Sequence, residues 1–444
     1  MKFTLPDDAF PEVKLPKEHQ ATLIEEAETV VRETIAANEA FLADGATFRD
    51  PRWRLVRAKE GLSVYRQRRT PTRNSRMSEG LRKTGSFLPA TLGSSWSADR
   101  SSSRRRPESK EHVGMATDEE PSVISSSTVG IQESKRRPNV SLMVLHGTVD
   151  GSLDDCMFGT FAGSDQAWMW RSSHINDRLD DARVLATIRK PTEKDPFRFL
   201  GIKWFAKEHP AVLSSIIQQR DFLIMEATGL TRDSKGETVG YYLMHSISLP
   251  GIIPELSDMG IVRGDVSLCF IDRQSGPGKV ELFCRGYSDP RGGMMDRVSV
   301  AIASDALICA AAVVDYAYVK KLTWLMKHKG SQTTHQRQYR REAGFPRPTR
   351  CESCDKSFSK FTWTGLGSGA ACQICHLVVC AKCSVGKKMT VDVSTTGSVK
   401  QCVLRFCLSC LLEAKEQSVW EMALSGVETA SECSSTSGSV RVLK

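Results

Sequence analysis

Hydrophobic residues recur at every third or fourth position over residues 17–43. This spacing puts them on one face and predicts an amphipathic helix. Two short runs with alternating character follow, Trp53–Ala58 and Leu62–Arg68, around the turn Lys59-Glu60-Gly61. They predict a pair of strands. The apolar stripe of the helix consists of Leu23, Ala27, Val30, Thr34, Ile35, Phe41 and Leu42.

Strand-like runs dominate the chain after Val140, where SLMVLHGTV predicts the first of them. Residues 150–161 then predict a short helix. Turn residues such as RDSKGE (232–237) separate several of the later runs. Most connections are too short for a crossover, so we expect the strands to be antiparallel. These runs are Arg183–Arg189, Phe197–Phe205, Asp221–Thr228, Val239–Ser248, Val266–Asp272 and Val280–Tyr287.

A long helix is predicted next, from about Met294 to Lys327. Its apolar stripe is wide enough to cover a curved sheet. A long helix laid across a bent antiparallel sheet can enclose an apolar cavity for a ligand that is mostly hydrocarbon. The longest uninterrupted apolar run, Ala306–Val314, is too short to span a bilayer.

Polar segments divide the chain. Residues 71–138 are rich in Ser, Arg, Pro and Thr without apolar periodicity, which predicts a disordered insertion. Residues 329–344 are polar and basic and are interpreted as a linker, and the tail over 416–444 is expected to be mostly loose after residue 425. The resulting domains are 1–70 with 139–328, and a cysteine-rich segment over 345–415.

Eight of the fourteen cysteines form four C-x2-C pairs in this cysteine-rich segment. Each pair can hold one side of a tetrahedral metal ion, so four pairs provide ligands for two closed zinc sites. Only four residues separate the second pair from the third, which favours an interleaved arrangement. One Zn2+ is then assigned to Cys351, Cys354, Cys380 and Cys383, and the other to Cys372, Cys375, Cys407 and Cys410.

Composition and charge limit the classes of protein and of binding partner that fit this sequence. The net charge of +9 is compatible with an anionic membrane. The other cysteines are scattered, the N-terminus has no apolar signal run, and a cytoplasmic protein is expected. No G-x-S-x-G, P-loop or H-E-x-x-H motif is present, which argues against an enzyme. The basic clusters at 104–106 and 135–137 lack interleaved aromatic residues, so no nucleic-acid partner is expected.

The first domain resembles the START lipid-binding domains. The residues that carry this resemblance are WRLVRAKEGLSVYRQR (53–68), QQRDFLIMEATG (218–229) and the helix DRVSVAIASDALICAAAVVDYAYVKKL (296–322). The resemblance implies an α+β fold of the helix-grip type, with a curved antiparallel sheet and a long C-terminal helix. It also implies that the domain binds, transfers or senses a lipid without chemistry.

The cysteine-rich segment resembles a FYVE zinc finger in its spacing, in VVCAKCSVGKK (378–388) and in Arg405-Phe406-Cys407. The resemblance implies a cross-brace domain with two zinc ions that binds phosphatidylinositol 3-phosphate on endosomal membranes. The chain departs from the family around Cys372, which follows Ser-Gly-Ala-Ala without the family's Arg and His residues. Each missing cation removes a charge-assisted phosphate bond worth roughly 1.5–3 kcal/mol.

Two sets of residues are candidates for membrane contact. Arg405 remains as a candidate ligand for a phosphoinositide head group, with an ordinary surface arginine as the alternative. Phe361, Trp363 and Leu366 could insert into the membrane interface. We therefore expect a peripheral protein at endosomal or other intracellular membranes, recruited by a membrane surface or a protein partner.

Two other readings remain open. In a RING-type ubiquitin ligase, His376 would replace Cys375 as a metal ligand, together with the other seven paired cysteines. Alternatively, the chain is a zinc-finger scaffold whose long helix caps a packed domain without a lipid cavity.

Overall fold

The computed structural model describes residues 3–6, 8–68, 125–126, 140, 142–208, 217–342, 348–358, 369–393 and 399–432. The chain divides into two units, Met1–Gln67 with Ile124–Lys444, and Arg68–Val123. The expected insertion over 71–138 lies outside the described residues, apart from the short strand β3 (Ser125–Ser126).

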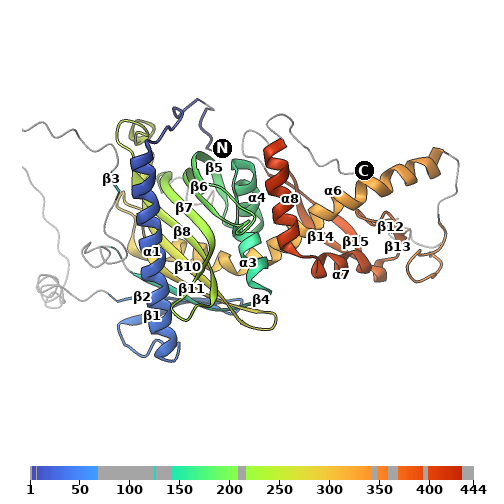
Figure 1. Cartoon of the computed structure of the whole chain (residues 1–444), viewed down its shortest axis with the longest axis horizontal. Coiled ribbons are helices and arrows are strands. Elements are labelled where there is room, and N and C mark those ends of the chain that lie inside the picture. Colours follow the sequence, from blue (N-terminus) through green and yellow to red (C-terminus); the bar gives the residue numbers. More distant parts are fainter. Residues whose placement is uncertain are drawn as a thin grey trace, which may run out of the picture. The chain divides into compact units, whose positions relative to one another are not determined.

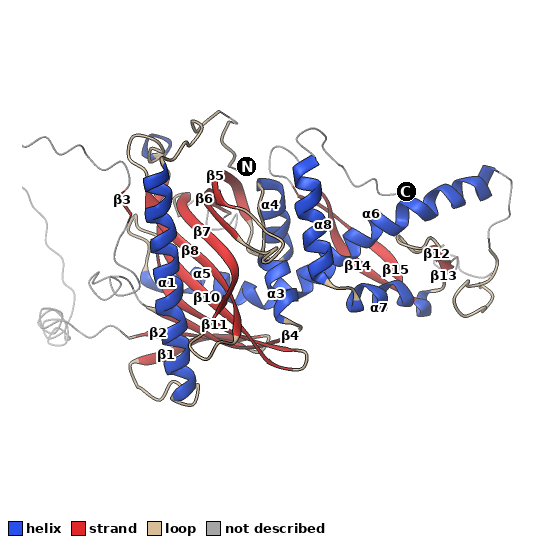
Figure 2. Cartoon of the chain, in the orientation of Figure 1, coloured by secondary structure: helices blue, strands red, loops and turns tan. Residues whose placement is uncertain are grey.

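The largest sheet of the first unit is antiparallel apart from one short strand (Figures 1 and 2). All the strands expected from the sequence are present in it. The short β9 (Val262–Arg263) pairs parallel with β7, and β3 pairs with β8. The order across the sheet is β1 (Trp53–Lys59), β2 (Leu62–Gln67), β4 (Met143–Asp150), β11 (Lys279–Asp289), β10 (Asp265–Gly276), β8 (Thr238–Ser248), β7 (Arg220–Arg232), β6 (Phe199–Lys207) and β5 (Leu179–Arg189).

Helix α1 (Lys17–Ala43) has the bounds that the periodicity predicted. It lies across the sheet and contacts β7, β8, β10 and β11 (Figure 1). Its buried side chains, including Leu23, Val30 and Ile35, join a core with Trp204 and Leu243 of the strands. One face of the sheet is thereby covered.

The other face is covered by α3 (Leu153–Thr160), α4 (Asp165–His174) and α5 (Asp296–Ile308). Helix α3, the short helix expected over 150–161, lies on β8 and β10, and α5 lies on β1, β2 and β11. Helix α4 was not expected from the sequence. It starts at Ser164, whose side chain accepts a hydrogen bond from the backbone N–H of Ala167 and so caps the helix.

The long C-terminal helix differs from the expectation in two ways. A 3-10 turn, Cys309–Ala312, separates α5 from α6 (Val313–Glu342). Helix α6 also continues to Glu342, within the segment 329–344 that we expected to be a linker. The combined stretch Asp296–Gly330 is long and apolar enough to cross a membrane, a test of length and composition that the core helix of a soluble protein also passes.

The cysteine-rich segment and the helix α8 after it, together called the finger below, follow α6. Helix α8 ends at Glu432, seven residues past the point after which the tail was expected to be mostly loose. The predicted fold class is confirmed: an α+β chain with an antiparallel sheet, a long C-terminal helix and a small domain with two cysteine groups. The elements of the finger are β12 (Ala370–Ala371), β13 (Val378–Val379), β14 (Ser384–Val393), β15 (Val399–Cys407), α7 (Leu408–Glu416) and α8 (Val419–Glu432).

Candidate metal centres and a buried polar network

The eight paired cysteines come together in the two interleaved groups that the spacing predicted. In each group the four sulfur atoms lie within 4.8 Å of one another. The first group joins Cys351 and Cys354 to Cys380 and Cys383. The second group joins Cys372, Cys375, Cys407 and Cys410.

Similar tight turns build the first half of each group. The backbone N–H of Asp355 donates to the carbonyl of Cys351, and that of His376 donates to the carbonyl of Cys372. Asp355 and His376 both adopt the left-handed conformation, at φ 55° and 59°. Each turn therefore reverses the chain directly after a C-x2-C pair and leaves both sulfur atoms of the pair facing the same point.

The groups fit tetrahedral zinc. Two Sγ–Sγ distances, 3.8 Å for Cys354–Cys380 and 3.6 Å for Cys375–Cys407, match the separation of about 3.8 Å in a tetrahedral Zn–S4 site. Backbone N–H groups also point at the sulfur atoms, as they do from Cys380 to Cys351 and from Cys410 to Cys407. Such hydrogen bonds stabilise thiolates, the form in which cysteine binds a metal.

The positions of Cys375 and His376 distinguish the eight-cysteine arrangement from the RING-type alternative. Cys375 belongs to the second group, whereas Nε2 of His376 lies 3.3 Å from the backbone oxygen of Gly330 on α6. His376 thus contacts the long helix and stands outside the ligand group. This arrangement is the one expected for a finger with eight cysteine ligands.

The core of the finger includes part of α6. Leu322 and Leu325 are buried together with Phe406 and the ligands Cys372 and Cys407. Tyr318, one turn before Leu322, donates a hydrogen bond from its hydroxyl to the carbonyl of Leu411 in α7. The finger is therefore built around the middle of α6, whose helix also packs against α3.

Of the residues expected to contact a membrane, the structure describes Arg405 but not the three apolar residues. Arg405 lies half-buried on β15, and its Nη1 donates to the hydroxyl of Ser384 at 3.1 Å. This hydrogen bond uses one edge of the guanidinium. Phe361, Trp363 and Leu366 lie outside the described residues.

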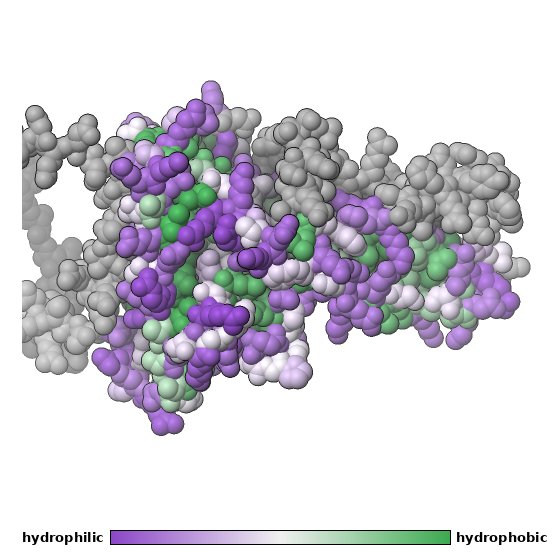
Figure 3. Space-filling model, viewed as in Figure 1, coloured by the Kyte–Doolittle hydropathy of each residue, from purple (hydrophilic) through white to green (hydrophobic). Residues whose placement is uncertain are grey.

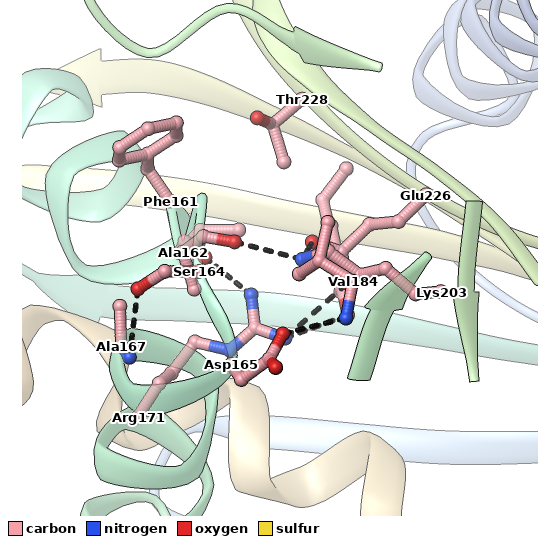
Figure 4. A network of polar contacts seen from close by, with 12 residues as sticks. Phe161, Ala162, Ser164, Asp165, Ala167, Arg171, Val184, Lys203, Glu226 and Thr228 are labelled. Carbon is pink, nitrogen blue, oxygen red and sulfur yellow. Dashed lines mark hydrogen bonds and ion pairs between the residues drawn. The ribbon is translucent and has the colours of Figure 1, made fainter. Parts of the chain in front are cut away.

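A second candidate site is a buried polar network on the sheet face that carries α3 and α4. Figure 4 shows the side chains of Arg171 from α4, Lys203 from β6 and Glu226 from β7 converging there. Lys203 pairs with one carboxylate oxygen of Glu226, and Arg171 lies 3.4 Å from the other. The hydroxyl of Tyr242 donates to Glu226 at 3.3 Å. The side chains of Lys203 and Glu226 are 0% exposed.

The segment between α3 and α4 completes this network with backbone oxygens. Lys203 donates to the carbonyl of Ala162 at 2.7 Å, and Arg171 donates to the carbonyl of Thr160. The ammonium of Lys203 also lies 4.6 Å from the ring centres of Trp168 and Phe199. A polar cluster is thus held inside an aromatic shell.

Two cations of the network, Arg171 and Lys203, pair directly with one carboxylate, that of Glu226. The charges of Asp165 and Asp177 act on Lys203 and Arg171 from further away. Nε of Arg171 has no hydrogen-bond partner among the described residues. Burial lowers the pKa of Lys203 to about 8, and the charge of Glu226 opposes that shift. An uncompensated buried charge is costly, so a bound anion would stabilise this site.

Two hollows of the described chain lie away from this network. One, of about 640 Å3, lies beside α1 and is lined by Val31, Ile35, Tyr241 and several charged residues. The other, of about 670 Å3, lies between α7 and α8. Figure 3 shows a largely hydrophilic surface on this side, with hydrophobic patches near α1 and over the finger.

Comparison of the sequence with protein-family models and with curated proteins finds no match. Among solved structures, human StAR-related lipid transfer protein 5 is similar at 15% identity, with a TM-score of 0.38 over 67% of this chain and 97% of that chain. Human STARD10 is similar at 10% identity, with a TM-score of 0.34 over 65% and 81%. At these TM-scores the fold class rests on the strands and helices themselves.

Proposed function

We propose that this chain is a non-enzymatic lipid-binding or lipid-sensing adaptor at intracellular membranes. A START-like domain would hold an amphiphilic lipid against the sheet face beneath α3, α4 and α5. A FYVE-related finger with two zinc ions would recruit the chain to a membrane or to a protein partner. The resemblance in sequence and the helix-grip arrangement support the first part, and the two cysteine groups support the second.

The buried network carries the proposal for lipid binding. Lys203 and Glu226 stand inside strands whose neighbours are apolar, and the sheet would be more stable with apolar residues there. Two cations that share the single directly paired carboxylate of Glu226, and the Nε of Arg171 without a partner among the described residues, suit a ligand that combines a hydrocarbon body with an anionic group. A lipid with a phosphate or carboxylate meets both conditions.

Native mass spectrometry of the purified full chain tests this proposal. We expect one class of anionic lipid at a stoichiometry near one, either co-purified or taken up from vesicles that contain phosphatidic acid. Lys203→Met should reduce its uptake, because it removes the buried cation, whereas Lys235→Met on an exposed turn should not. A chain that binds no lipid under either condition would instead favour a scaffold.

The cysteine ligands can be tested against the RING-type alternative. Cys375→Ser should lower the zinc content from two ions per chain to one, because it removes a ligand of the second group. His376→Ala, at the adjacent residue, should keep two zinc ions. The zinc content of the two variants is measured by atomic absorption. Zinc loss in the histidine variant alone would support a RING domain. A self-ubiquitination assay would then measure its ligase activity.

The membrane selectivity of the finger is proposed to be weak. Arg405 is the one family phosphate ligand that this sequence retains, and part of its guanidinium is engaged by Ser384. Liposome sedimentation with and without phosphatidylinositol 3-phosphate should show little selectivity for that lipid. Strong, selective sedimentation that disappears in Arg405→Ala would overturn this expectation and would indicate an endosomal membrane as the target.

A further inference from the structure

The segment Ser152–His174, called the cover below, contains α3 and α4 and closes over the buried network. Its backbone supplies the carbonyl groups of Thr160 and Ala162, and its side chains supply Arg171. Because Lys203 and Glu226 have no exposed side-chain surface, a ligand can reach them only when a covering element moves. What holds the cover therefore controls access to the network.

Strand β14 of the finger holds the C-terminal end of the cover. The hydroxyls of Ser173 and Thr390 are 3.1 Å apart, and the backbone N–H of Thr390 donates to Nε2 of His174 at 3.2 Å. The ring of His174 also stacks on Tyr316 of α6, with 5.1 Å between ring centres. These contacts start only two residues after Arg171.

Helix α8 holds the N-terminal half of the cover. Val419 and Met422 of α8 are buried in one cluster with Met157 and Phe158 of α3. Trp420 meets the ring of Phe197 edge to face, at 5.6 Å between ring centres. This half of the cover is thus packed under a helix that follows the last cysteine ligand.

Helix α6 adds a third set of contacts. The ammonium of Lys320 donates to the carbonyl groups of Phe158 and Phe161 at the end of α3, and burial lowers its pKa to about 7. Lys321 pairs with Asp155 of α3 at 2.7 Å, and its ammonium lies 3.5 Å from the carbonyl of Lys415 in α7. Lys321 thereby connects the cover directly to the finger.

Both cysteine groups border the parts of the finger that touch the cover. Cys383 immediately precedes β14, and Cys407 ends β15 opposite Ser384. Cys410 lies in α7, which leads into α8. Because metal binding supplies much of the folding energy of so small a domain, the positions of β14 and α8 depend on the loaded sites.

We propose that the finger is a latch for the cover: while its metal sites are loaded it keeps the cover closed over the network, and its release opens the network to ligand. The proposal rests on the proposed function only in treating the network as the lipid site. Local opening of this kind requires that the cover be less stable than the sheet beneath it. The strands β6 and β7 would then stay folded while the cover moves.

The test measures exposure of the network directly. The zinc-loaded full chain is treated with an amine-acetylating reagent, and modification of Lys203 is followed by peptide mass spectrometry. His174→Ala and Trp420→Ala each remove one contact of the latch and should speed this modification by about tenfold or more. His146→Ala is the matched control, because the ring of His146 on β4 meets Phe41 of α1 at 4.9 Å, on the sheet face opposite the cover.

Three further measurements keep the test decisive. Zinc content must remain at two ions in each variant, and backbone amides of β6 and β7 must stay protected from hydrogen exchange, which excludes global unfolding. Zinc removal by a chelator should expose Lys203 in the unaltered chain. The latch is refuted if Lys203 stays protected both in the variants and after chelation. Absence of uptake from phosphatidic acid vesicles, with Lys203 exposed as expected, would refute the lipid site and leave the latch standing.

Discussion

Lys203 and Glu226 are charged residues in the middle of apolar strands, in FLGIKWFAK and in RDFLIMEATGLTR. The sequence contains that signal, because a lone charge in the middle of a buried strand needs a partner. Their pairing could not be predicted, since it depends on the register that sets Lys203 opposite Ile224 and Glu226 opposite Gly201. Arg171 was missed because the helix that carries it was missed.

Neutralising Glu226 should be strongly destabilising. In Glu226→Gln the cations of Arg171 and Lys203 lose their shared counter-ion, and breaking a buried ion pair costs about 3–5 kcal/mol. The same substitution at Glu237, which pairs with Arg273 but is 62% exposed, should cost about 1 kcal/mol or less. Urea unfolding of both zinc-loaded variants checks the contrast, and equal costs would contradict it.

Asp272 on β10 predicts a pH dependence. Its Oδ2 accepts a hydrogen bond from the thiol of Cys156 at 3.2 Å, and burial raises its pKa from 3.8 to about 7. Between those values the folded chain keeps a proton that the unfolded chain has lost, so the free energy of unfolding falls as the pH rises to about 7 and changes little above it.

Asp272→Asn should remove this dependence. Its stability relative to the unaltered chain should rise by about 1 kcal/mol between pH 6 and pH 8. Asp258→Asn, on an exposed turn, should show no such trend. Unfolding curves at several pH values, with zinc present throughout, measure the free energy of unfolding of each variant relative to the unaltered chain. If that relative stability does not change with pH for Asp272→Asn, the carboxyl of Asp272 is less buried than the structure shows.

At the scale of elements, periodicity predicted α1 and the strands well, because each presents one apolar face to a core. Helix α4 (DQAWMWRSSH) has no such clear stripe, and besides the adjacent β5 it contacts β14, which lies more than 200 residues further along the chain. The break at Cys309–Ala312 was also missed, since CAAA is compatible with a continuous helix. Tertiary contacts, which a local pattern does not contain, determine both features.

The crossing of α3 and α6 depends on Gly159. A Cβ atom there would lie 1.9 Å from the carbonyl oxygen of Val313, a backbone atom that cannot move alone. Gly159→Ala should therefore push the helices apart and destabilise the chain by roughly 1–3 kcal/mol. Gly276→Ala meets no atom within 4 Å and should be near neutral. Thermal unfolding compares the two, and similar midpoints would show that the helices are loosely packed.

At the scale of the whole molecule, the cysteine spacing predicted the two ligand groups but not their surroundings. The sequence predicted a first domain that ends at residue 328, separated from the finger by a linker over 329–344. The structure instead places Leu322 and Leu325 in the core of the finger, and Val419 and Met422 against α3. These contacts join segments on either side of the expected boundary, so spacing within either segment could not reveal them.

A substitution outside the finger should consequently weaken zinc binding. Leu325→Ala leaves a cavity against the ligand cysteines, costs about 2–5 kcal/mol, and should lower zinc affinity by at least about tenfold. Leu307→Ala, on the part of the helix that covers the sheet, should destabilise the chain without changing zinc affinity. Competition with a zinc-binding dye measures both, and equal affinities would show that the finger folds independently of α6.

The single helix α6 leaves no natural place to cut the chain. A fragment starting at residue 345, where the cysteine pattern begins, would lose two leucines of its own core, and a fragment ending at residue 328 would expose them to solvent. Either fragment would expose an apolar surface that is buried in the full chain, and we expect it to aggregate. The residues between Val313 and Leu325 pack in several hydrophobic cores at once. An insertion there would rotate the helical residues after it relative to those before it, so the two sets could no longer face their cores together.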